Sequence, residues 1–265
     1  MNEWGKTANH INTLAHFLGE RDINELSQEQ LMRRYGINQA DVMVLFGGSI
    51  LAGGDILAQA IKNNVAKKYI IVGGAGHTTQ TLRQQVQQEY PEIETTDLPE
   101  AETFQRYLRY VYGCGADCLE TKSTNCGNNI TYLLDLLQER NITFKNIILS
   151  QDASMQKRMA AGLRKYMPRD ITIINYAAYC AKVLYLDEEL VYEENIHGMW
   201  TIDRYINLLM GEIPRLTDDK NGYGPNGRNY IAHVDIPEKV KNAFEELKGI
   251  YGDKTREANP LYSSM

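Results

Sequence analysis

Long apolar runs and clusters of basic residues are missing from this sequence of 265 residues. No stretch approaches the roughly 20 apolar residues of a membrane-spanning helix, and the first residues lack the basic and apolar segments of a signal peptide. The 28 Lys and Arg against 34 Asp and Glu give a formal net charge of -6, without the clustered basic footprint that nucleic-acid binding needs. We therefore expect a cytoplasmic protein that has no membrane span and no nucleic-acid partner.

Cysteine is also scarce, with four residues in the whole chain. A chain of this length can bury a sizeable core without disulfides, so free thiols are expected. Cys114 and Cys118 have no His or second Cys pair at ligand spacing, and the sequence therefore predicts no metal site. Nothing in the sequence indicates an oligomeric state.

What the sequence does contain is a repeated pattern of short apolar runs that end in glycine. VMVLFGG (42–48) and YIIVGGAG (69–76) have this form, and weaker or similar runs follow at 118–120, 146–152 and 171–176. Helical patterns, with apolar residues three and four positions apart, separate the runs. This alternation predicts an α/β fold: a Rossmann-like, doubly wound, mainly parallel sheet with helices on both faces.

The flanking segments suggest three parts to the chain. Residues 1–40 are expected to form a helical N-terminal preface, 41–182 the Rossmann-like core, and 183–265 a small C-terminal lobe of helices and loops. Within that lobe, residues 217–228 form a loop dense in Gly, Asp and Asn, and loops of this length are often functional.

In an open parallel sheet, ligands bind beyond the carboxyl ends of the strands, so the residues after each strand are the candidates. Glycine there lets backbone N–H groups approach an anion, although tight packing alone explains such glycines equally well. Neither of the first two loops matches a phosphate-binding loop or the dinucleotide fingerprint. The candidate ligand-binding residues of these two loops are Gly47, Gly48, Ser49, Gly73, Gly74 and Gly76.

Polar residues follow the later strands. Glu120 ends the third strand, and Thr124 and Asn125 lie at the next helix entry, where either can cap the helix or contact a ligand. Gln151 and Asp152 follow the fourth strand. One or two turns later comes Arg158, which can hold an anionic ligand or pair with a carboxylate.

Two residues are candidates for proton transfer. Glu100 opens the helix before the third strand, where a carboxylate is also favourable for the helix dipole alone. His77 is the histidine in a strand-end loop, where a hydrogen bond that stabilises the loop is the alternative role.

Taken together, these residues resemble the YdcF branch of the SanA/ElyC/YdcF family of bacterial α/β proteins. The resemblance runs from about residue 42 to 240, and two long and unusual blocks make it specific. The residues on which the resemblance depends are IIVGGAGHTT (70–79), Glu100 and Ala101, Glu120 with STNCG (123–127), QDASMQKR (151–158), and WTIDRYINLLMGEIPRL continuing into DDKNGYGPNGR (200–228).

The resemblance implies a Rossmann-like sheet with a small C-terminal lobe and binding of S-adenosylmethionine at the strand-end loops. It brings no established reaction. Other branches commonly have Glu at the position of Asn128 and His at that of Met155, so chemistry that relies on those groups is not expected here. The glycine-rich loop of ordinary methyltransferases is also missing.

Three hypotheses follow for function. The first is binding of a small nucleotide-like ligand, S-adenosylmethionine foremost, with a possible methyl transfer; the glycines would contact anionic groups, and Glu100 and Glu120 would suit the sulfonium charge. The second is a hydrolase or transferase acting on a phosphorylated or sugar-nucleotide substrate, with Glu100 or His77 as general base and Arg158 stabilising charge. The third is a non-enzymatic ligand sensor in which the 217–228 loop closes on the ligand.

Overall fold

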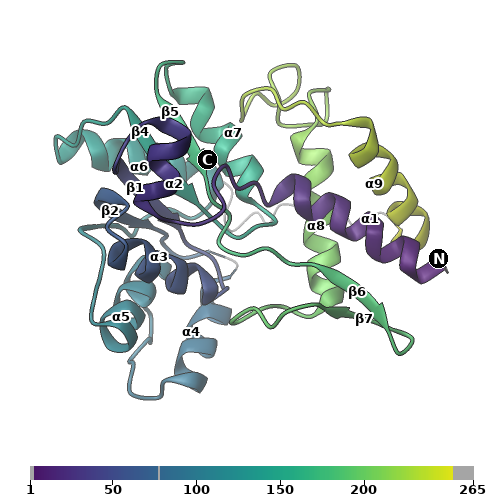
Figure 1. Cartoon of the computed structure of the whole chain (residues 1–265), viewed down its shortest axis with the longest axis horizontal. Coiled ribbons are helices and arrows are strands. Elements are labelled where there is room, and N and C mark those ends of the chain that lie inside the picture. The colour runs from purple at the N-terminus through teal and green to yellow at the C-terminus, as the bar shows by residue number, and fades with distance from the viewer. Residues whose placement is uncertain (1–2, 77, 253–265) are drawn as a thin grey trace. The chain divides into compact units, whose positions relative to one another are not determined.

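The computed structural model describes residues 3–76 and 78–252 (Figure 1). The helices are α1 (Glu3–Leu18), α2 (Gln28–Tyr35), α3 (Ala52–Lys62), α4 (Thr79–Glu89), α5 (Glu100–Tyr112), α6 (Cys126–Glu139), α7 (Gln156–Tyr166), α8 (Ile202–Leu216) and α9 (Glu238–Tyr251). The strands are β1 (Ala40–Phe46), β2 (Ala66–Val72), β3 (Cys118–Glu120), β4 (Asn146–Ser150), β5 (Thr172–Asn175), β6 (Val183–Leu186) and β7 (Glu189–Tyr192).

These elements form two compact units, each built from separated stretches of the chain. Unit 1 contains described residues 3–20, 153–166 and 179–252, and unit 2 contains 21–76, 78–152 and 167–178. The grouping differs from the division predicted at residues 40 and 182. The apolar face of α1, with Ile11, Leu14 and Leu18 fully buried, packs on α8 and α9, so the first helix belongs with the C-terminal elements.

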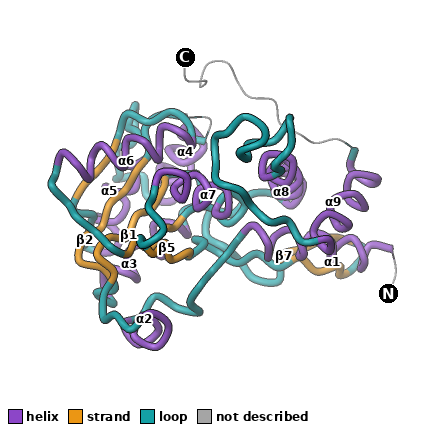
Figure 2. The backbone as a smooth tube through the Cα atoms, turned by 90° about the horizontal axis from the view of Figure 1, so that it is seen from above, coloured by secondary structure: helices purple, strands orange, loops and turns teal. Residues whose placement is uncertain are grey.

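Unit 2 holds a five-stranded parallel sheet, in the order β3-β2-β1-β4-β5 among the described residues; strands are orange in Figure 2. The predicted doubly wound α/β fold is confirmed. β1 is buried along almost its whole length, as expected for a strand covered on both faces, and this explains its continuous apolar sequence. The same unit contains a core cluster of buried apolar side chains, including Met43, Ile71, Phe104 and Ile148.

The strand order creates a switch point between β1 and β4. From β1 the chain passes to β2 and β3 on one side, and then returns through α6 to β4 on the other side of β1. The register places the last residues of the strands at one edge: Phe46 pairs with Val72, Val72 with Glu120, and Leu45 with Ser150. The loops after β1, β2, β3 and β4 therefore begin at the same edge of the sheet.

Unit 1 is mainly helical, with an antiparallel hairpin, β6–β7. The sequence pattern did not predict this hairpin. Its two turn residues, Asp187 and Glu188, have positive φ values of 47° and 67°, yet neither is the Asn or Gly that usually signals such a turn. Helix α8 runs to Leu216, because its buried apolar face continues through Ile213 and Leu216.

The 217–228 loop of unit 1 is packed against itself. A side chain at Gly222 would meet the Thr217 carbonyl oxygen at 2.0 Å, and one at Gly227 would meet the Asp219 carbonyl oxygen at 2.2 Å. The start of the loop is tied to the segment that follows it, because Nδ1 of His233 lies 2.6 Å from Asp218 Oδ2. That hydrogen bond raises the pKa of His233. Closure of this loop on a ligand stays a prediction.

Tyr107 should contribute measurably to the stability of unit 2. Its buried hydroxyl donates a hydrogen bond of 2.5 Å to Asp55 Oδ1, which also accepts one from Tyr112. Because Asp55 would lose a donor, Tyr107→Phe should lower the free energy of unfolding by about 1.5–3 kcal/mol, measured by urea denaturation. Tyr132→Phe, at an exposed tyrosine on α6, is the control and should stay within about 0.5 kcal/mol of the parent protein. Equal effects of the two variants would contradict the assignment.

Candidate functional site

The candidate site lies in unit 2 at the carboxyl ends of β1, β2, β3 and β4. Ligands of doubly wound sheets bind at this edge, in the crevice at the switch point. Here the switch point falls between β1 and β4. The structure brings the predicted residues of these four strand ends to one edge of the sheet.

The loops after β1 and β4 are joined directly by side-chain contacts. Gln151 Nε2 donates a hydrogen bond of 3.1 Å to the Gly47 carbonyl oxygen, and Gln151 Oε1 accepts one of 2.6 Å from the Asp152 backbone N–H. A side chain at Gly48 would lie 2.5 Å from Asp152 Oδ2. Glycine at this position therefore leaves room for the Asp152 carboxylate, and the next residue, Ser49, is fully buried.

Glu100 is held between the ends of β1 and β2. Its backbone N–H donates to the Gly74 carbonyl oxygen at 2.9 Å. Its Oε1 accepts hydrogen bonds from the hydroxyls of Thr78 at 2.8 Å and Thr79 at 3.0 Å. Its Oε2 lies 2.4 Å from the position that a Cβ of Gly47 would take, so any side chain there would displace the carboxyl group.

Burial of this carboxyl group changes its acidity. Removal from water disfavours the charged form, and it raises the pKa of Glu100 from 4.5 to about 7, although the hydrogen bonds from Thr78 and Thr79 act in the opposite direction. A carboxyl group with this pKa is partly protonated at neutral pH. It can accept or donate a proton there, or become ionised when a cation binds beside it.

A second buried acid, Glu120, shapes the loop after β3. Its Oε1 accepts hydrogen bonds from the backbone N–H groups of Lys122, at 2.6 Å, and Ser123, at 3.0 Å. Its Oε2 is buried and has no hydrogen-bond partner among the described residues. The Ser123 hydroxyl in turn accepts a hydrogen bond of 3.2 Å from the Gly74 N–H, which ties this loop to the loop after β2.

The loop after β2 is linked to Glu100 through a threonine. The Gly76 N–H donates to Thr79 Oγ1 at 2.7 Å, and the same hydroxyl donates to Glu100. A side chain at Gly73 would lie 3.0 Å from Glu100 Cβ, so this glycine also makes space for the acid. His77, which was predicted as a proton-transfer group, lies outside the described residues.

Asn125 caps helix α6. Its Oδ1 accepts a hydrogen bond of 3.0 Å from the Asn128 N–H, and its Nδ2 donates one of 2.8 Å to Asn128 Oδ1. The Thr124 hydroxyl donates to the same amide oxygen at 3.2 Å. Capping thus accounts for Asn125 at this helix entry, and ligand contacts by Asn125 and Thr124 stay predictions.

Arg158 belongs to unit 1, whereas the strand ends belong to unit 2. Its guanidinium donates two hydrogen bonds to the buried carboxylate of Glu212, at 2.5 and 3.0 Å. Of the two roles considered for Arg158, pairing with a carboxylate is the one that the structure contains. Contact with an anionic ligand stays a prediction.

Three polar residues of this edge were missed as site residues. Thr78 and Thr79 donate to Glu100, and Ser150, at the end of β4, has a buried hydroxyl without a hydrogen-bond partner among the described residues. Two threonines directly after a glycine-rich loop are a visible signal, because hydroxyls in the first turn of a helix can reach a nearby acid. Ser150 had no such signal, since it ends an apolar run.

No family model matches this chain. The resemblance to the YdcF branch therefore stays a prediction. The four cysteines, Cys114, Cys118, Cys126 and Cys180, are free thiols. In the described part of the chain, no three His, Cys, Asp or Glu side chains are grouped to hold a metal ion, and no helix is both long and apolar enough to cross a bilayer.

The packing around Gly74 predicts a contrast between two neighbouring glycines. A Cβ on Gly74 would lie 2.2 Å from the Ser123 carbonyl oxygen, whereas one on Gly76 would have its nearest neighbour, the Thr124 carbonyl oxygen, at 3.5 Å. Gly74→Ala should therefore lower the free energy of unfolding by about 1–3 kcal/mol. Gly76→Ala should change it by less than about 0.5 kcal/mol. Urea denaturation measures both, and equal stabilities would contradict the packing.

Glu100 should make stability depend on pH. With a pKa of about 7 in the folded protein and 4.5 as its ordinary value, the folded state binds more protons between these values, so stability from this group falls as pH rises through that interval. The full effect is about 3 kcal/mol. In Glu100→Gln the fall between pH 5 and pH 8 should shrink by about this amount, whereas Glu102→Gln, in the same helical turn, should retain it. Urea denaturation at several pH values measures the slope, and an unchanged slope in Glu100→Gln would contradict the assignment.

Proposed function

We propose that unit 2 binds a small nucleotide-like ligand, S-adenosylmethionine foremost, at the carboxyl ends of β1, β2, β3 and β4. The observation that carries the proposal is the convergence of polar groups at the switch point. Gly47 and Gly48, after β1, face Gln151 and Asp152, after β4. This is the position at which doubly wound sheets bind nucleotides.

Each group at this edge can serve a distinct part of such a ligand. The carboxylate of Asp152 can accept hydrogen bonds from ribose hydroxyls, as an acidic residue does in many nucleotide-binding sheets. The amide of Gln151 is already oriented by the Gly47 carbonyl oxygen and the Asp152 N–H. Backbone groups of the glycine-rich loop after β2 can contact the carboxylate of the ligand.

The buried acids support a ligand that carries a positive charge. Glu100 and Glu120 both adjoin the Gly73–Gly74 segment: the Gly73 N–H donates to the Glu120 carbonyl oxygen at 2.9 Å, and Gly74 accepts from the Glu100 N–H. A unit charge about 4 Å from a carboxylate gains roughly 4 kcal/mol of Coulomb energy at an effective dielectric constant of about 20. A sulfonium or ammonium group of the ligand would therefore favour ionisation of Glu100.

A second function, hydrolysis or group transfer on a phosphorylated or sugar-nucleotide substrate, is favoured by one observation. The pKa of Glu100, raised to about 7 by burial, suits a general base or acid at neutral pH. In this alternative, Glu100 transfers a proton to or from the substrate and does not balance the charge of a cationic ligand. Turnover of such a substrate that is lost in Glu100→Gln would support it.

Ligand binding should be linked to proton release from Glu100. At pH 7 this group is about half protonated, so a cation that forces ionisation should release roughly half a proton per ligand. The affinity for S-adenosylmethionine should then rise from pH 6 to pH 8. S-adenosylhomocysteine has a neutral thioether in place of the sulfonium and should release fewer protons. Calorimetric titration in two buffers with different ionisation enthalpies measures the number of protons released.

Matched variants test whether S-adenosylmethionine binds at this site or elsewhere on the protein. Asp152→Asn should weaken S-adenosylmethionine binding by about tenfold, the loss of one or two hydrogen bonds to a charged group. Asp135→Asn, at an exposed position on α6, should leave the affinity unchanged. Glu100→Gln should abolish the proton release. If neither S-adenosyl compound binds and only phosphorylated ligands produce heat on titration, the results would support the second function instead.

A further inference from the structure

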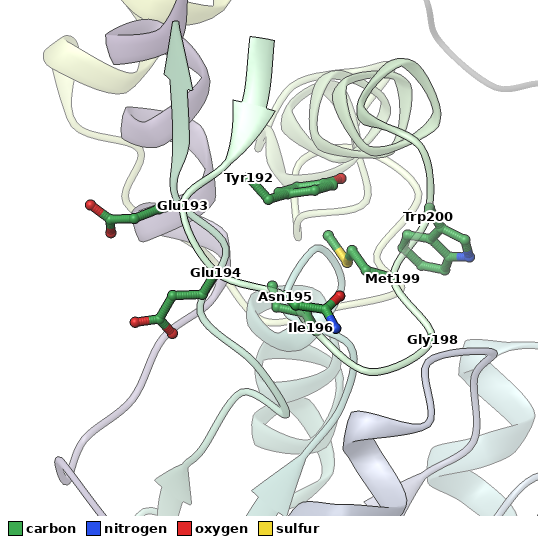
Figure 3. A pocket seen from close by; sticks show the side chains of 8 residues that line it. All are labelled: Tyr192, Glu193, Glu194, Asn195, Ile196, Gly198, Met199 and Trp200. Atoms are coloured by element: carbon green, nitrogen blue, oxygen red, sulfur yellow. The ribbon is translucent and has the colours of Figure 1, made fainter. Parts of the chain in front are cut away.

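Two hollows lie along the β6–β7 hairpin of unit 1, and their linings differ in charge. The first has a volume of about 470 Å³ and is formed by residues 192–196 and 198–200 (Figure 3). In Figure 3 the side chains of Glu193 and Glu194 point away from Tyr192 and Met199. Glu193 is also paired with Lys182 at 2.6 Å, so little negative charge faces the interior of this hollow.

The second hollow, which we call the hairpin pocket, has a volume of about 400 Å³. This lies within the range of about 300–1,000 Å³ that is usual for small-molecule sites. Its lining combines three aromatic with three acidic side chains: Trp4, Tyr185, Tyr251, Glu188, Glu189 and Asp203. Among the described residues that line it there is no Lys, Arg or His.

The aromatic wall of the hairpin pocket is organised and accessible. The rings of Trp4 and Tyr185 are stacked, with centroids 6.2 Å apart and planes inclined by 17°. Trp4 is 45% exposed, so its ring can be reached from solvent. Two stacked rings with an accessible surface offer the negative faces of their π systems to a cation.

Among the residues that the structure describes, no base forms an ion pair with the acidic side of the hairpin pocket. In the described part of the chain, none of its three carboxylates forms an ion pair. The nearest base in sequence, Arg204, has its guanidinium over the ring of Trp200 at 5.2 Å. The N-terminus of α8, beside Asp203, contributes only about half a positive charge, which three carboxylates exceed.

We propose that the hairpin pocket binds a small organic cation, an alkylated ammonium group that packs on the Trp4–Tyr185 stack and faces the carboxylates of Glu188, Glu189 and Asp203. The aromatic faces attract the charge and bury the alkyl groups, and the carboxylates supply the counter-charge. A neutral ligand of the same shape gains only the apolar part of this binding. The pocket lies wholly within unit 1, so the proposal is independent of the nucleotide-like ligand of unit 2.

Choline is the probe, and its uncharged isostere 3,3-dimethylbutan-1-ol is the control ligand. The full chain is titrated at constant ionic strength, with calorimetry and tryptophan fluorescence as independent readouts. Choline should bind saturably and change the fluorescence of Trp4, and the isostere should bind at least about tenfold more weakly. The fluorescence change should persist in Trp200→Phe, in which Trp4 is the remaining tryptophan of the sequence.

Substitutions at the rim test the charge without touching the core. Asp203→Asn combined with Glu189→Gln should weaken choline binding by about tenfold, and Trp4→Leu should do the same. Glu246→Gln, at an exposed acid of α9 outside the pocket, should leave the affinity unchanged. All these positions are at least partly exposed, and circular dichroism verifies that each variant is folded. Failure of choline to saturate, equal binding of the isostere, or full affinity in the double variant would overturn the proposal.

Discussion

A buried carboxyl group constrains the ends of β1 and β2 and the start of the helix that follows β2. Glu100 lies where β1 and β2 end, and Gly47 and Gly73 leave the space that its side chain fills. Thr78 and Thr79 donate to it from the start of the next helix, and its backbone N–H binds the Gly74 carbonyl oxygen. Because a charged group in this position is costly, the loops that surround Glu100 must supply hydrogen bonds, and they are thereby fixed relative to one another.

The strand order determines which polar groups lie together at the carboxyl edge of the sheet. Because β4 lies on the opposite side of β1 from β2, the loops after β1 and β4 adjoin: Gly48 leaves room for Asp152, and Gln151 bridges the two loops. Glycines here make room for acidic side chains of the protein itself. This edge therefore combines buried carboxyl groups with amide and hydroxyl groups that hydrogen-bond to them or to the neighbouring loops.

In unit 1, the hairpin pocket combines acidic with aromatic side chains. It depends on the hairpin turn at Asp187 and Glu188, where two residues other than glycine have positive φ. The turn places acidic side chains beside the stacked rings of Trp4 and Tyr185, which lie far apart in the sequence. Each unit thus combines carboxylates with a second kind of group: amides and hydroxyls in unit 2, and aromatic rings in unit 1.

The sequence by itself determined the fold class and the strand-end loops, because apolar runs that end in glycine are local signals and the edge at which such strands end follows from parallel pairing. Only the tertiary structure decided which side chains fill the space beside Gly47 and Gly48, that Arg158 pairs with Glu212, and that α1 joins the C-terminal elements. It also decided that the pKa of Glu100 is raised, since burial depends on packing between segments distant in sequence. The hairpin escaped prediction because Asp187 is followed by Glu188 and not by the glycine that completes the usual two-residue turn signal.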